Sequence, residues 1–599
     1  MIFFSRIASY LLTTGVLLFC LNIPLSAAER EVVILTYHDV VEDNNELAND
    51  AVTTDHLVGH FEWLKANGYH PVSIDDLRDA RDGIKSLPDK PVFLSWDDGY
   101  TSFYTYVFPL LKAYNYPAAV SIVGSWMVPG ENELVQYGNK KVARNKFMSW
   151  KQLQEIHSSG LVEIASHSYN MHTDILATQL GDRIPSACMK ELNPKTKYYE
   201  TDQQYRQRIK NDLQASSDQI LNRLGFRPRV MVWPYGCYNQ VAVNIAAEIG
   251  MSITLSIDPV PADIEHLEKA GRFYLTKNPD IQQFRSFLHV TRYPDVKRFF
   301  RADSRDLLES STKEEQRYDV FINRVKKLNP SMVIVDPVVK TEGSYKALFV
   351  NSRFPLAQDR LNRICWHTRK RTGTTVFLWL ASDLFVLKDK EKQDTVNHFF
   401  SDMGKSAPVD GLIINNPILI KELLAIAGSK AKSQQLEPPS WNPDVRQRAR
   451  QGFVESAVNW KAAQLLQPIE AFQQWQPFLE VSAVLSMKQF LSMELKQFNL
   501  LFKLFDFITI DVGDERVVSF KEMVKKQVDM LHSSKYMRKI SFIFSAGDGI
   551  NLSRELEKMP EMNIINWGYQ FDNFLKNIPN ASLVKPFISK QKFPYPLHD

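Results

Sequence analysis

Side chains suited to acid–base and metal chemistry follow four apolar runs in the first half of the chain. If those runs are parallel strands, their carboxyl ends share one face of the fold, where active sites are built. Residues far apart in the sequence would then converge there. The four polar clusters are Tyr37-His38-Asp39, Asp97-Asp98-Gly99, His167, and Pro234-Tyr235-Gly236.

Asp98, His167 and His172 combine a carboxylate oxygen with two imidazoles, a recurrent ligand set for a catalytic metal with open positions. Adjacent carboxylates after a strand need not point the same way, so Asp97 can serve as general base while Asp98 binds the ion. His38 can act as general acid. Alone, Asp-Asp-Gly is common turn chemistry, and a histidine pair is weak evidence. Their joint order, each after an apolar run, favours a site.

The elements that must position these residues form an alternating series from about residue 31 to 276. Apolar runs without polar alternation are typical of buried parallel strands. Residues 53–67 and 202–224 have helical length, and Gly68 and Gly225 stand where each helix would stop. The series predicts an α/β fold, either a barrel or an open sheet. The runs are 32–37, 92–96, 118–123, 162–166, 230–233 and 253–256.

The second half contains another series of apolar runs separated by helical segments. Seven such runs fit a (β/α)8-like barrel or a relative of one. Residues 277–312 are rich in charge and aromatics without clean periodicity, so the junction is expected there. The predicted organisation is a signal at 1–28, a first domain at 29–290, a linker at 291–312 and a barrel at 313–599. The runs are 332–335, 375–379, 411–414, 481–485, 507–510, 540–544 and 564–567.

Composition places the chain among folded globular proteins. Hydrophobic residues make up 44% and charged residues 23% of its 599 positions, so most of it is expected to fold into at least two domains. The 72 basic and 68 acidic residues leave a formal charge of +4. This net charge is too small to indicate nucleic-acid binding. Neither a nucleic-acid nor a nucleotide partner is expected.

The N-terminus reads as a secretory signal. An apolar run at 7–21 follows Arg6, and Ser26-Ala27-Ala28 places small residues for cleavage. Two alternatives stay open: the run is close to the roughly 20 residues of a spanning anchor, and Cys20 is a candidate for lipidation, although the bulky Phe19 precedes it.

Cleavage after Ala28 would leave Cys188, Cys237 and Cys365. An odd number of cysteines at wide spacings does not resemble a disulfide framework or a cysteine-based metal site. The sequence therefore predicts that stability comes from hydrophobic cores.

The motifs resemble those of the polysaccharide deacetylases of carbohydrate esterase family 4. SWDDG at 95–99 is similar to their (T/S)FDDG motif, HSYNMH at 167–172 to H(S/T)xxH, and WPYG at 233–236 to RxPYG. The histidines are five apart instead of four, Val232 stands where the family has arginine, and His38 lies near the start of the chain. These departures, with TYHDV at 36–40 and HTDILAT at 172–178, resemble the exported poly-β-1,6-N-acetylglucosamine deacetylases, which add a C-terminal glycoside-hydrolase-like barrel.

The resemblance implies a distorted (β/α) deacetylase barrel and one divalent metal, with Zn, Co, Ni and Fe not distinguished. It implies ligands at Asp98, His167 and His172, a base at Asp97, and a backbone amide at Tyr235 that helps to hold the oxyanion. It also implies an N-acetylglucosamine polymer as substrate, an outer-membrane exporter as partner, and a place in the periplasm or on the periplasmic face of the outer membrane. Two alternatives stay open: another N-acetylated glycan such as peptidoglycan or chitin fragments, and a non-catalytic glycan-binding scaffold.

The barrel is expected to bind glycan without cleaving it. In the resembling subgroup the strand DGxLF ends in an acidic pair, whereas this chain has DGLIINN, with Asn415 and Asn416 in place of carboxylates. Glycoside cleavage needs two carboxyl groups. The amides could bond sugar hydroxyls, and Trp379 and Trp567 could stack on sugars unless they belong to the core. Acids near other strand ends, which leave cleavage open, are Asp336, Asp383, Asp511, Asp514 and Glu515.

Overall fold

The computed structural model describes most of the chain. The described residues are 31–42, 47–130, 132–138, 140–288, 296–308, 313–387, 392–428, 450, 460–476, 479–513, 520–534, 536–547 and 549–589. The expected signal at 1–28, Cys20, Asp514 and Glu515 lie outside them. Within these residues, no helix is both long enough and apolar enough to cross a membrane.

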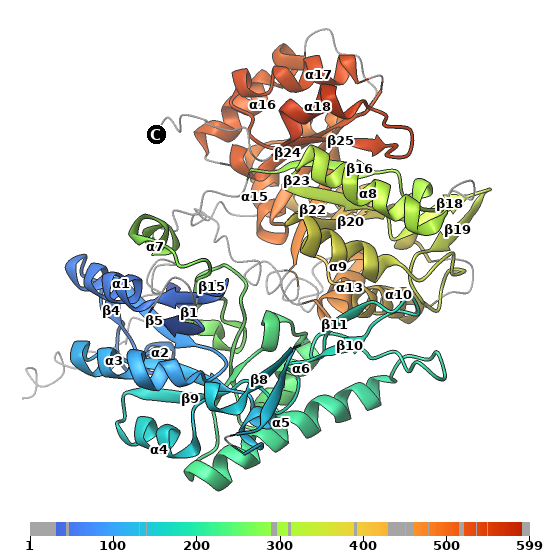
Figure 1. Ribbon diagram of the computed structural model, residues 1–599. Helices are drawn as coiled ribbons and strands as arrows, with labels where there is room; N and C mark the ends of the chain where they lie inside the picture. The colour runs from blue at the N-terminus through green and yellow to red at the C-terminus, as the bar shows by residue number, and fades with distance from the viewer. Residues whose placement is uncertain are drawn as a thin grey trace, which may run out of the picture.

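The first half of the chain folds around a curved, open and mostly parallel sheet with helices packed outside it (Figure 1). The strand order is β13-β12-β9-β6-β5-β1-β14, with β4 beside β5 and β15 beside β1. This agrees with the predicted distorted barrel. The strands are β1 (Glu31–Tyr37), β4 (His70–Pro71), β5 (Pro91–Trp96), β6 (Ala118–Ile122), β9 (Val162–Ser166), β12 (Val230–Val232), β13 (Ile253–Leu255), β14 (Ala262–Asp263) and β15 (Phe273–Tyr274).

Both faces of this sheet are covered, which explains why its strands lack polar alternation. Leu35 and Leu94 face one buried hydrophobic cluster, whereas their neighbours Ile34 and Phe93 face another on the opposite side. Successive strand residues point to opposite faces, so consecutive apolar residues are buried on both sides of the sheet. The covered sheet holds the strand ends as a rigid platform.

The longest helix of this half begins and ends at residues typical of helix caps. The long α5 (Asp202–Leu224) at the bottom of Figure 1 starts at a capping box between Thr201 and Gln204 and ends at Gly225, whose φ is 86°. The other helices are α1 (Thr54–Ala66), α2 (Ile74–Arg81), α3 (Phe108–Tyr114), α4 (Trp150–Ser158), α6 (Gln240–Glu248) and α7 (Ile281–Leu288). Short paired strands are β2 (Asp39–Val41) with β3 (Ala51–Thr53), β7 (Leu134–Tyr137) with β8 (Lys140–Ala143), and β10 (Asp174–Leu176) with β11 (Arg183–Pro185).

The second half forms a closed parallel barrel, as predicted, in the order β16-β17-β20-β21-β22-β23-β24-β25. Its strands are β16 (Arg298–Ala302), β17 (Met332–Val335), β20 (Thr375–Ala381), β21 (Gly411–Asn415), β22 (Glu480–Ser486), β23 (Phe507–Gly513), β24 (Ile540–Ser545) and β25 (Trp567–Asp572). Its helices are α8 (Glu314–Leu328), α9 (Leu361–Thr372), α10 (Gln393–Ser406), α11 (Pro417–Gly428), α13 (Trp460–Gln473), α14 (Met487–Ser492), α15 (Leu495–Leu504), α16 (Phe520–Ser533), α17 (Ile550–Glu557) and α18 (Ala581–Ile588). A hairpin, β18 (Val338–Thr341) with β19 (Ser344–Ala347), follows β17.

The barrel begins earlier than the sequence suggested. Strand β16 lies inside 291–312, the segment expected to be a linker, and pairs with both β17 and β25. Its two arginines hid it, because they interrupt the apolar pattern although Arg298 is fully buried above the ring of Trp567. The predicted bounds of the last strand were also wrong: it runs from Trp567 to Asp572, not over 564–567.

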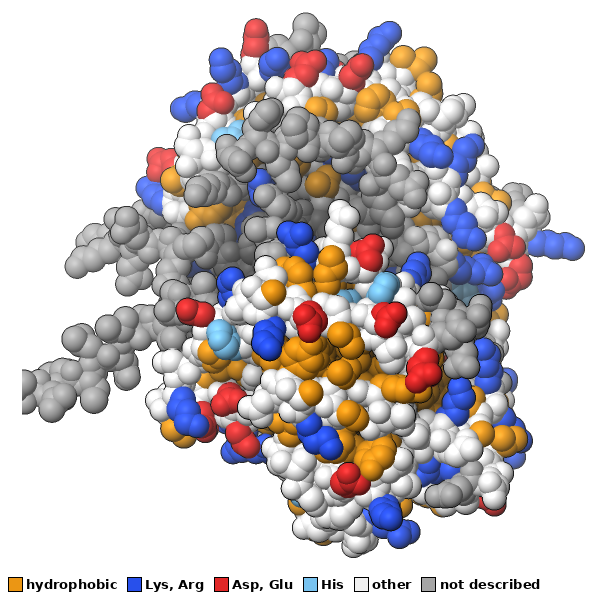
Figure 2. Space-filling model, turned by 60° about the vertical axis from the view of Figure 1, so that its left-hand side comes forward, with side chains coloured by type: hydrophobic (Ala, Val, Ile, Leu, Met, Phe, Trp, Pro, Cys, Tyr) orange, Lys and Arg blue, Asp and Glu red, His pale blue; other side chains and the backbone are white. Residues whose placement is uncertain are grey.

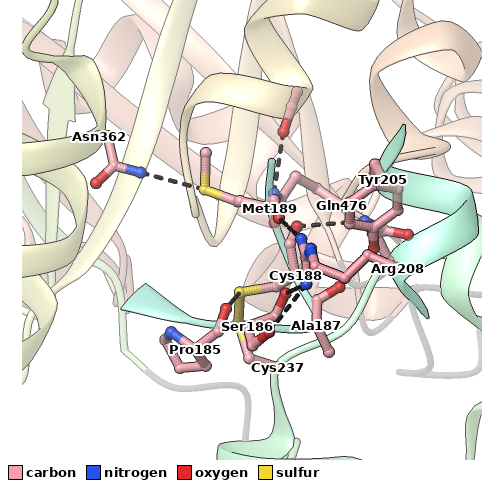
Figure 3. Close-up of a disulfide and its surroundings, with 12 residues drawn as sticks. Pro185, Ser186, Ala187, Cys188, Met189, Tyr205, Arg208, Cys237, Asn362 and Gln476 are labelled. Carbon is pink, nitrogen blue, oxygen red and sulfur yellow. Dashed lines mark hydrogen bonds between the residues drawn. A yellow bond between two sulfur atoms is a disulfide. The ribbon is translucent and has the colours of Figure 1, made fainter. Parts of the chain in front are cut away.

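The expectation that cysteines would not be bridged is wrong. Cys188 and Cys237 form a disulfide, with their Cα atoms 5.2 Å apart (Figure 3). An odd cysteine count does not exclude one bridge, and Cys365, the other cysteine among the described residues, is free and buried in the barrel. The pair is 49 residues apart in the sequence, so only the fold reveals that the two residues meet.

The molecule presents a mixed surface on the side shown in Figure 2. Acidic and basic side chains are interspersed over that face, and hydrophobic side chains gather on its lower part, which belongs to the first half of the chain.

Candidate active site

The carboxyl ends of neighbouring parallel strands carry the residues predicted to do chemistry. His38 follows β1, and the Asp97-Asp98 pair follows β5. His167 follows β9, and the turn Pro234–Gly236 follows β12. Because these strands belong to one sheet, their ends place the four polar clusters at the same edge.

Asp98, His167 and His172 come together as a buried cluster. One ligand atom from each lies within 4.8 Å of the others. The Nε2 atoms of His167 and His172 lie 3.4 and 3.3 Å from Asp98 Oδ1, yet among the described residues that oxygen accepts no hydrogen bond of good geometry. Burial alone would raise the pKa of Asp98, but the two histidines hold it well below the ordinary value.

A sharp backbone turn separates the two aspartates. Asp98 has a φ of 71° and the next residue, Gly99, a φ of 68°. Both are left-handed, and a Cβ on Gly99 would lie 2.9 Å from Cγ2 of Ile122, so only glycine fits there. The turn directs Asp98 to the histidines while Asp97 points elsewhere, as the sequence predicted for adjacent carboxylates.

The cluster is oriented by hydrogen bonds behind it. Nδ1 of His167 lies 2.8 Å from the carbonyl oxygen of Val232, an arrangement that leaves Nε2 free to face Asp98. The hydroxyl of Tyr137 donates to Asp98 Oδ2 at 2.8 Å. Trp126 packs edge-on against His172, with ring centroids 4.8 Å apart. Tyr137 and Trp126 had no motif to mark them in the sequence.

Asp97 is held by Arg272, a residue that sequence reasoning missed. Arg272 is fully buried and donates through Nη1 and Nη2 to the two oxygens of Asp97, both at 2.8 Å. Ser121 donates to the same carboxylate at 3.1 Å. Burial would raise the pKa of Asp97, but the Arg272 charge outweighs it and lowers the pKa to about 2. The carboxylate is therefore ionised and fixed in direction.

His38 and Tyr235 lie at the edge of this arrangement. His38 is half-buried, and its ring centroid is 4.6 Å from that of Tyr274. Tyr235 is 41% exposed. Its ring centroid is 4.5 Å from that of His172, and its hydroxyl donates to the His172 carbonyl oxygen at 3.4 Å.

Residues 84–254 match the family described as polysaccharide deacetylase, a span that includes Asp97, Asp98, His167, His172 and Tyr235. This segment is therefore similar to polysaccharide deacetylases. It is 32% identical over 352 residues to a poly-beta-1,6-N-acetyl-D-glucosamine N-deacetylase of Escherichia coli (strain K12), covering 58% of this chain and 52% of that protein. The chain thus spans about half the length of this curated relative.

Two solved structures are similar to parts of the chain. A de-N-acetylase from Aggregatibacter actinomycetemcomitans is 37% identical, with 43% of this chain and 99% of that chain covered and a TM-score of 0.41. The glycoside hydrolase domain of PgaB (BpsB) from Bordetella bronchiseptica is 17% identical, with 49% and 99% covered and a TM-score of 0.37.

The arginine at the site comes from a segment outside the resembling motif. Val232 occupies the position where the resembling motif carries arginine, and it contributes only its backbone carbonyl to His167. The guanidinium comes instead from Arg272, 40 positions later by residue number, just before β15. The departure at Val232 was the one signal in the sequence that an arginine had to be supplied from elsewhere.

The barrel residues proposed to bind sugar occupy different environments. Asn416 is buried, and its Oδ1 accepts from the amides of Ile418 and Leu419 at the start of α11. Asn415 is the half-buried last residue of β21. Trp379 and Trp567 are only 2% and 1% exposed. The expectation that these rings offer stacking faces is therefore corrected: both are core, and Asn416 is a helix cap.

Proposed function

We propose that the chain is an exported, metal-dependent N-deacetylase of poly-β-1,6-N-acetyl-D-glucosamine. The observation that carries this proposal is the buried cluster of Asp98, His167 and His172 beside an independently held carboxylate, Asp97. The name of the E. coli relative favours this polymer over other N-acetylated glycans.

The cluster fits a divalent cation. Two imidazoles and one carboxylate offer ligand atoms on three sides and leave other positions for water and substrate, as in catalytic sites. Asp98 Oδ1 is buried and has no hydrogen-bond partner among the described residues. Buried polar atoms are normally satisfied, so this oxygen is suited to binding a metal ion. When bound, the ion would supply Lewis-acid activation of the acetamide carbonyl and of water. The donor set suits Zn, Co, Ni or Fe.

The surrounding residues then have distinct tasks. The Asp97 carboxylate, kept ionised and oriented by Arg272, takes the proton from the attacking water. The backbone amide of Tyr235 donates to the oxygen on which negative charge develops. His38 gives a proton to the leaving amine nitrogen. The amine product is cationic at neutral pH, so deacetylation changes the charge of the polymer.

Acetate release tests this proposal. The purified protein would be incubated with β-1,6-linked N-acetylglucosamine oligomers, chitin oligomers and peptidoglycan fragments, with and without chelator and with each metal restored in turn. We expect acetate from the β-1,6 oligomers, its loss on chelation and its return with metal. Release from chitin or peptidoglycan alone would assign another glycan, and binding without release would make the chain a scaffold.

Export is supported by the disulfide, because such bonds form and persist in oxidising compartments. We infer a periplasmic location or the periplasmic face of the outer membrane, beside an exporter of the polymer. The expected mature N-terminus is Glu29, after Ser26-Ala27-Ala28. Mass spectrometry of the exported protein checks this. A lipid-modified Cys20 at the N-terminus, or an intact leader, would contradict it.

The barrel is expected to leave the polymer chain intact. Its strand end carries Asn415 and Asn416, and an amide neither accepts a proton near neutral pH nor attacks an anomeric carbon. Nearby acids are engaged: Asp336 is ion-paired with Arg301, and Asp511 accepts from Gln570.

Counting reducing ends checks this prediction. The full-length Asp97→Asn variant, which lacks the proposed base, would be incubated with partly deacetylated β-1,6-glucosamine polymer beside a buffer control. We expect no new reducing ends above the control. If the Asp97→Asn variant did produce new reducing ends, and if adding Asp336→Asn or Asp511→Asn to it abolished them, the barrel would be a glycosidase.

A further inference from the structure

The disulfide lies next to the site in the sequence as well as in space. Cys237 is two residues after Tyr235, the residue whose ring rests against His172. Its partner, Cys188, belongs to the segment that continues from His172 through the hairpin β10–β11. The bond therefore joins the loop that carries a proposed ligand to the loop that carries the proposed oxyanion donor.

The hairpin makes this connection short. The amide of Ser186 donates to the carbonyl oxygen of Thr173 at 3.1 Å, so the chain just before Cys188 returns to the residue after His172. A continuous ring results: from His172 through this hydrogen bond to Cys188, across the disulfide to Cys237, and back to the ring of Tyr235. Each link in this ring is a stretch of backbone, a hydrogen bond, the disulfide or a contact between rings.

Hydrogen bonds from neighbouring elements hold the backbone around Cys188 in place (Figure 3). The side-chain amide of Asn239 donates to the Cys188 carbonyl oxygen at 3.2 Å, and the Tyr205 hydroxyl donates to the Ala187 carbonyl oxygen at 2.5 Å. Arg208 donates to the carbonyl oxygens of Ser186 at 2.9 Å and Met189 at 3.0 Å. The backbone on both sides of Cys188 is therefore immobilised against α5 and the start of α6.

The barrel fastens the same hairpin from its other side. Trp366 of α9 packs on the hydrophobic cluster that contains Cys188 and Met189. Asn362, also on α9, donates to the sulfur of Met189 at 3.1 Å, and His367 lies 3.2 Å from Asp182 in the hairpin loop. The β10–β11 hairpin segment therefore connects the barrel to the site that contains His172.

The turn at Tyr235 and Gly236, just before Cys237, has a backbone conformation that its surroundings must stabilise. Tyr235 has a φ of 58°, which is left-handed and unfavourable for a residue with a Cβ. Gly236 follows at 65°, and a Cβ there would lie 2.2 Å from Cγ1 of Ile257. Strained turns of this kind persist only when the surroundings over-determine them. Tyr235 is 41% exposed, so the packing of its own side chain does not fix the turn alone.

We propose that the Cys188–Cys237 disulfide is a positioning element that holds the Tyr235 turn, and with it the Tyr235 backbone amide, at the face of the Asp98, His167 and His172 cluster. The proposal rests on the proposed function, because the turn is given an oxyanion role there. The disulfide acts through Tyr235 and touches no reacting atom. Two of the three proposed metal ligands have other supports, since Asp98 lies just after the end of β5 and His167 directly follows β9. His172 is also held by the ring of Trp126.

The double variant Cys188→Ala/Cys237→Ala tests this role. A misplacement of about 1 Å can cost roughly a hundredfold in rate; we expect kcat to fall about tenfold, with KM within twofold and metal content unchanged. The matched control is Cys365→Ala, which removes a buried cysteine of the barrel outside the ring and should leave kcat unchanged. An unaltered kcat in the double variant, or an equal fall in the control, would overturn the proposal. So would loss of metal along with kcat.

Hydrogen exchange gives a readout that does not need activity. Peptides covering 172–176 and 234–239 should exchange faster in the double variant than in wild type, whereas strands β5 and β9 should not change. Equal exchange at 234–239 would refute the positioning role even if the protein released no acetate, an outcome that would separately refute the proposed function. If the double variant failed to fold, folded wild type would be reduced, alkylated at both thiols and measured in the same two ways.

Discussion

Asp97→Asn should lower kcat by about 10²–10⁴-fold, the range that a positioned general base contributes, while the protein keeps its metal. Asparagine has nearly the shape of aspartate and one oxygen that still accepts from Arg272, but it takes no proton near neutral pH. Asp97 is not among the three clustered ligands, so metal binding should survive. Acetate release and metal content, measured on the same preparation, check both halves of this expectation.

Asp39→Asn is the matched control for that experiment. Asp39 is the first residue of β2, two residues after β1, and its carboxylate accepts from Ser102 and from the amide of Val40. It should lose no activity. The Asp97 variant also leaves the buried Arg272 charge uncompensated, which costs on the order of 3–5 kcal/mol when a buried pair is broken. Unfolding curves are therefore needed to choose a temperature at which every variant is folded. A kcat within tenfold of wild type would remove Asp97 from the role of base.

The convergence of the motifs was predictable because it follows from strand geometry. Each proposed ligand or base comes directly after an apolar run or in the loop behind it, and parallel strands bring such ends to one edge. His167 and Asp98 needed nothing more than this rule. The direction of Asp97 away from Asp98 also followed, since a turn at an Asp-Asp-Gly sequence separates neighbouring side chains.

Arg272 and the disulfide were not predictable in the same way. Arg272 reaches Asp97 across 175 positions, and Cys188 reaches Cys237 across 49. Such pairs depend on how the sheet curves, which periodicity does not encode. An isolated arginine before a short strand reads as a surface residue, because arginine is almost never fully buried unless it is paired, and its partner was unknown.

In the barrel, the sequence analysis missed one strand because that strand contains charged residues. Its apolar runs marked seven strands, but β16 was hidden by Arg298 and Arg301, which lie over the rings of Trp567 and Trp379. A guanidinium over an indole face is compatible with burial, so charge in a run does not exclude a strand. The same contacts explain why the two tryptophans, attractive as sugar platforms in the sequence, are part of the core.

Loss of metal should follow replacement of any clustered ligand. Asp98→Ala, His167→Ala and His172→Ala each remove one of three protein ligands, and the remaining pair cannot hold an ion as tightly. We expect metal content to fall to background and acetate release to be abolished. Elemental analysis after gel filtration checks the first, and the same acetate assay checks the second.

His70→Ala controls for the loss of a histidine as such. His70 is exposed and interacts through Nδ1 with the carbonyl oxygen of Asp89, so metal content and acetate release should match wild type. Among the ligand variants, added metal should restore His172→Ala more readily than His167→Ala. His172 lies in a loop, whereas His167 directly follows β9 and is locked by the Val232 carbonyl oxygen. The decisive comparison is with Asp97→Asn: if that variant emptied the site while Asp98→Ala kept its metal, the roles of the two neighbouring aspartates would be reversed.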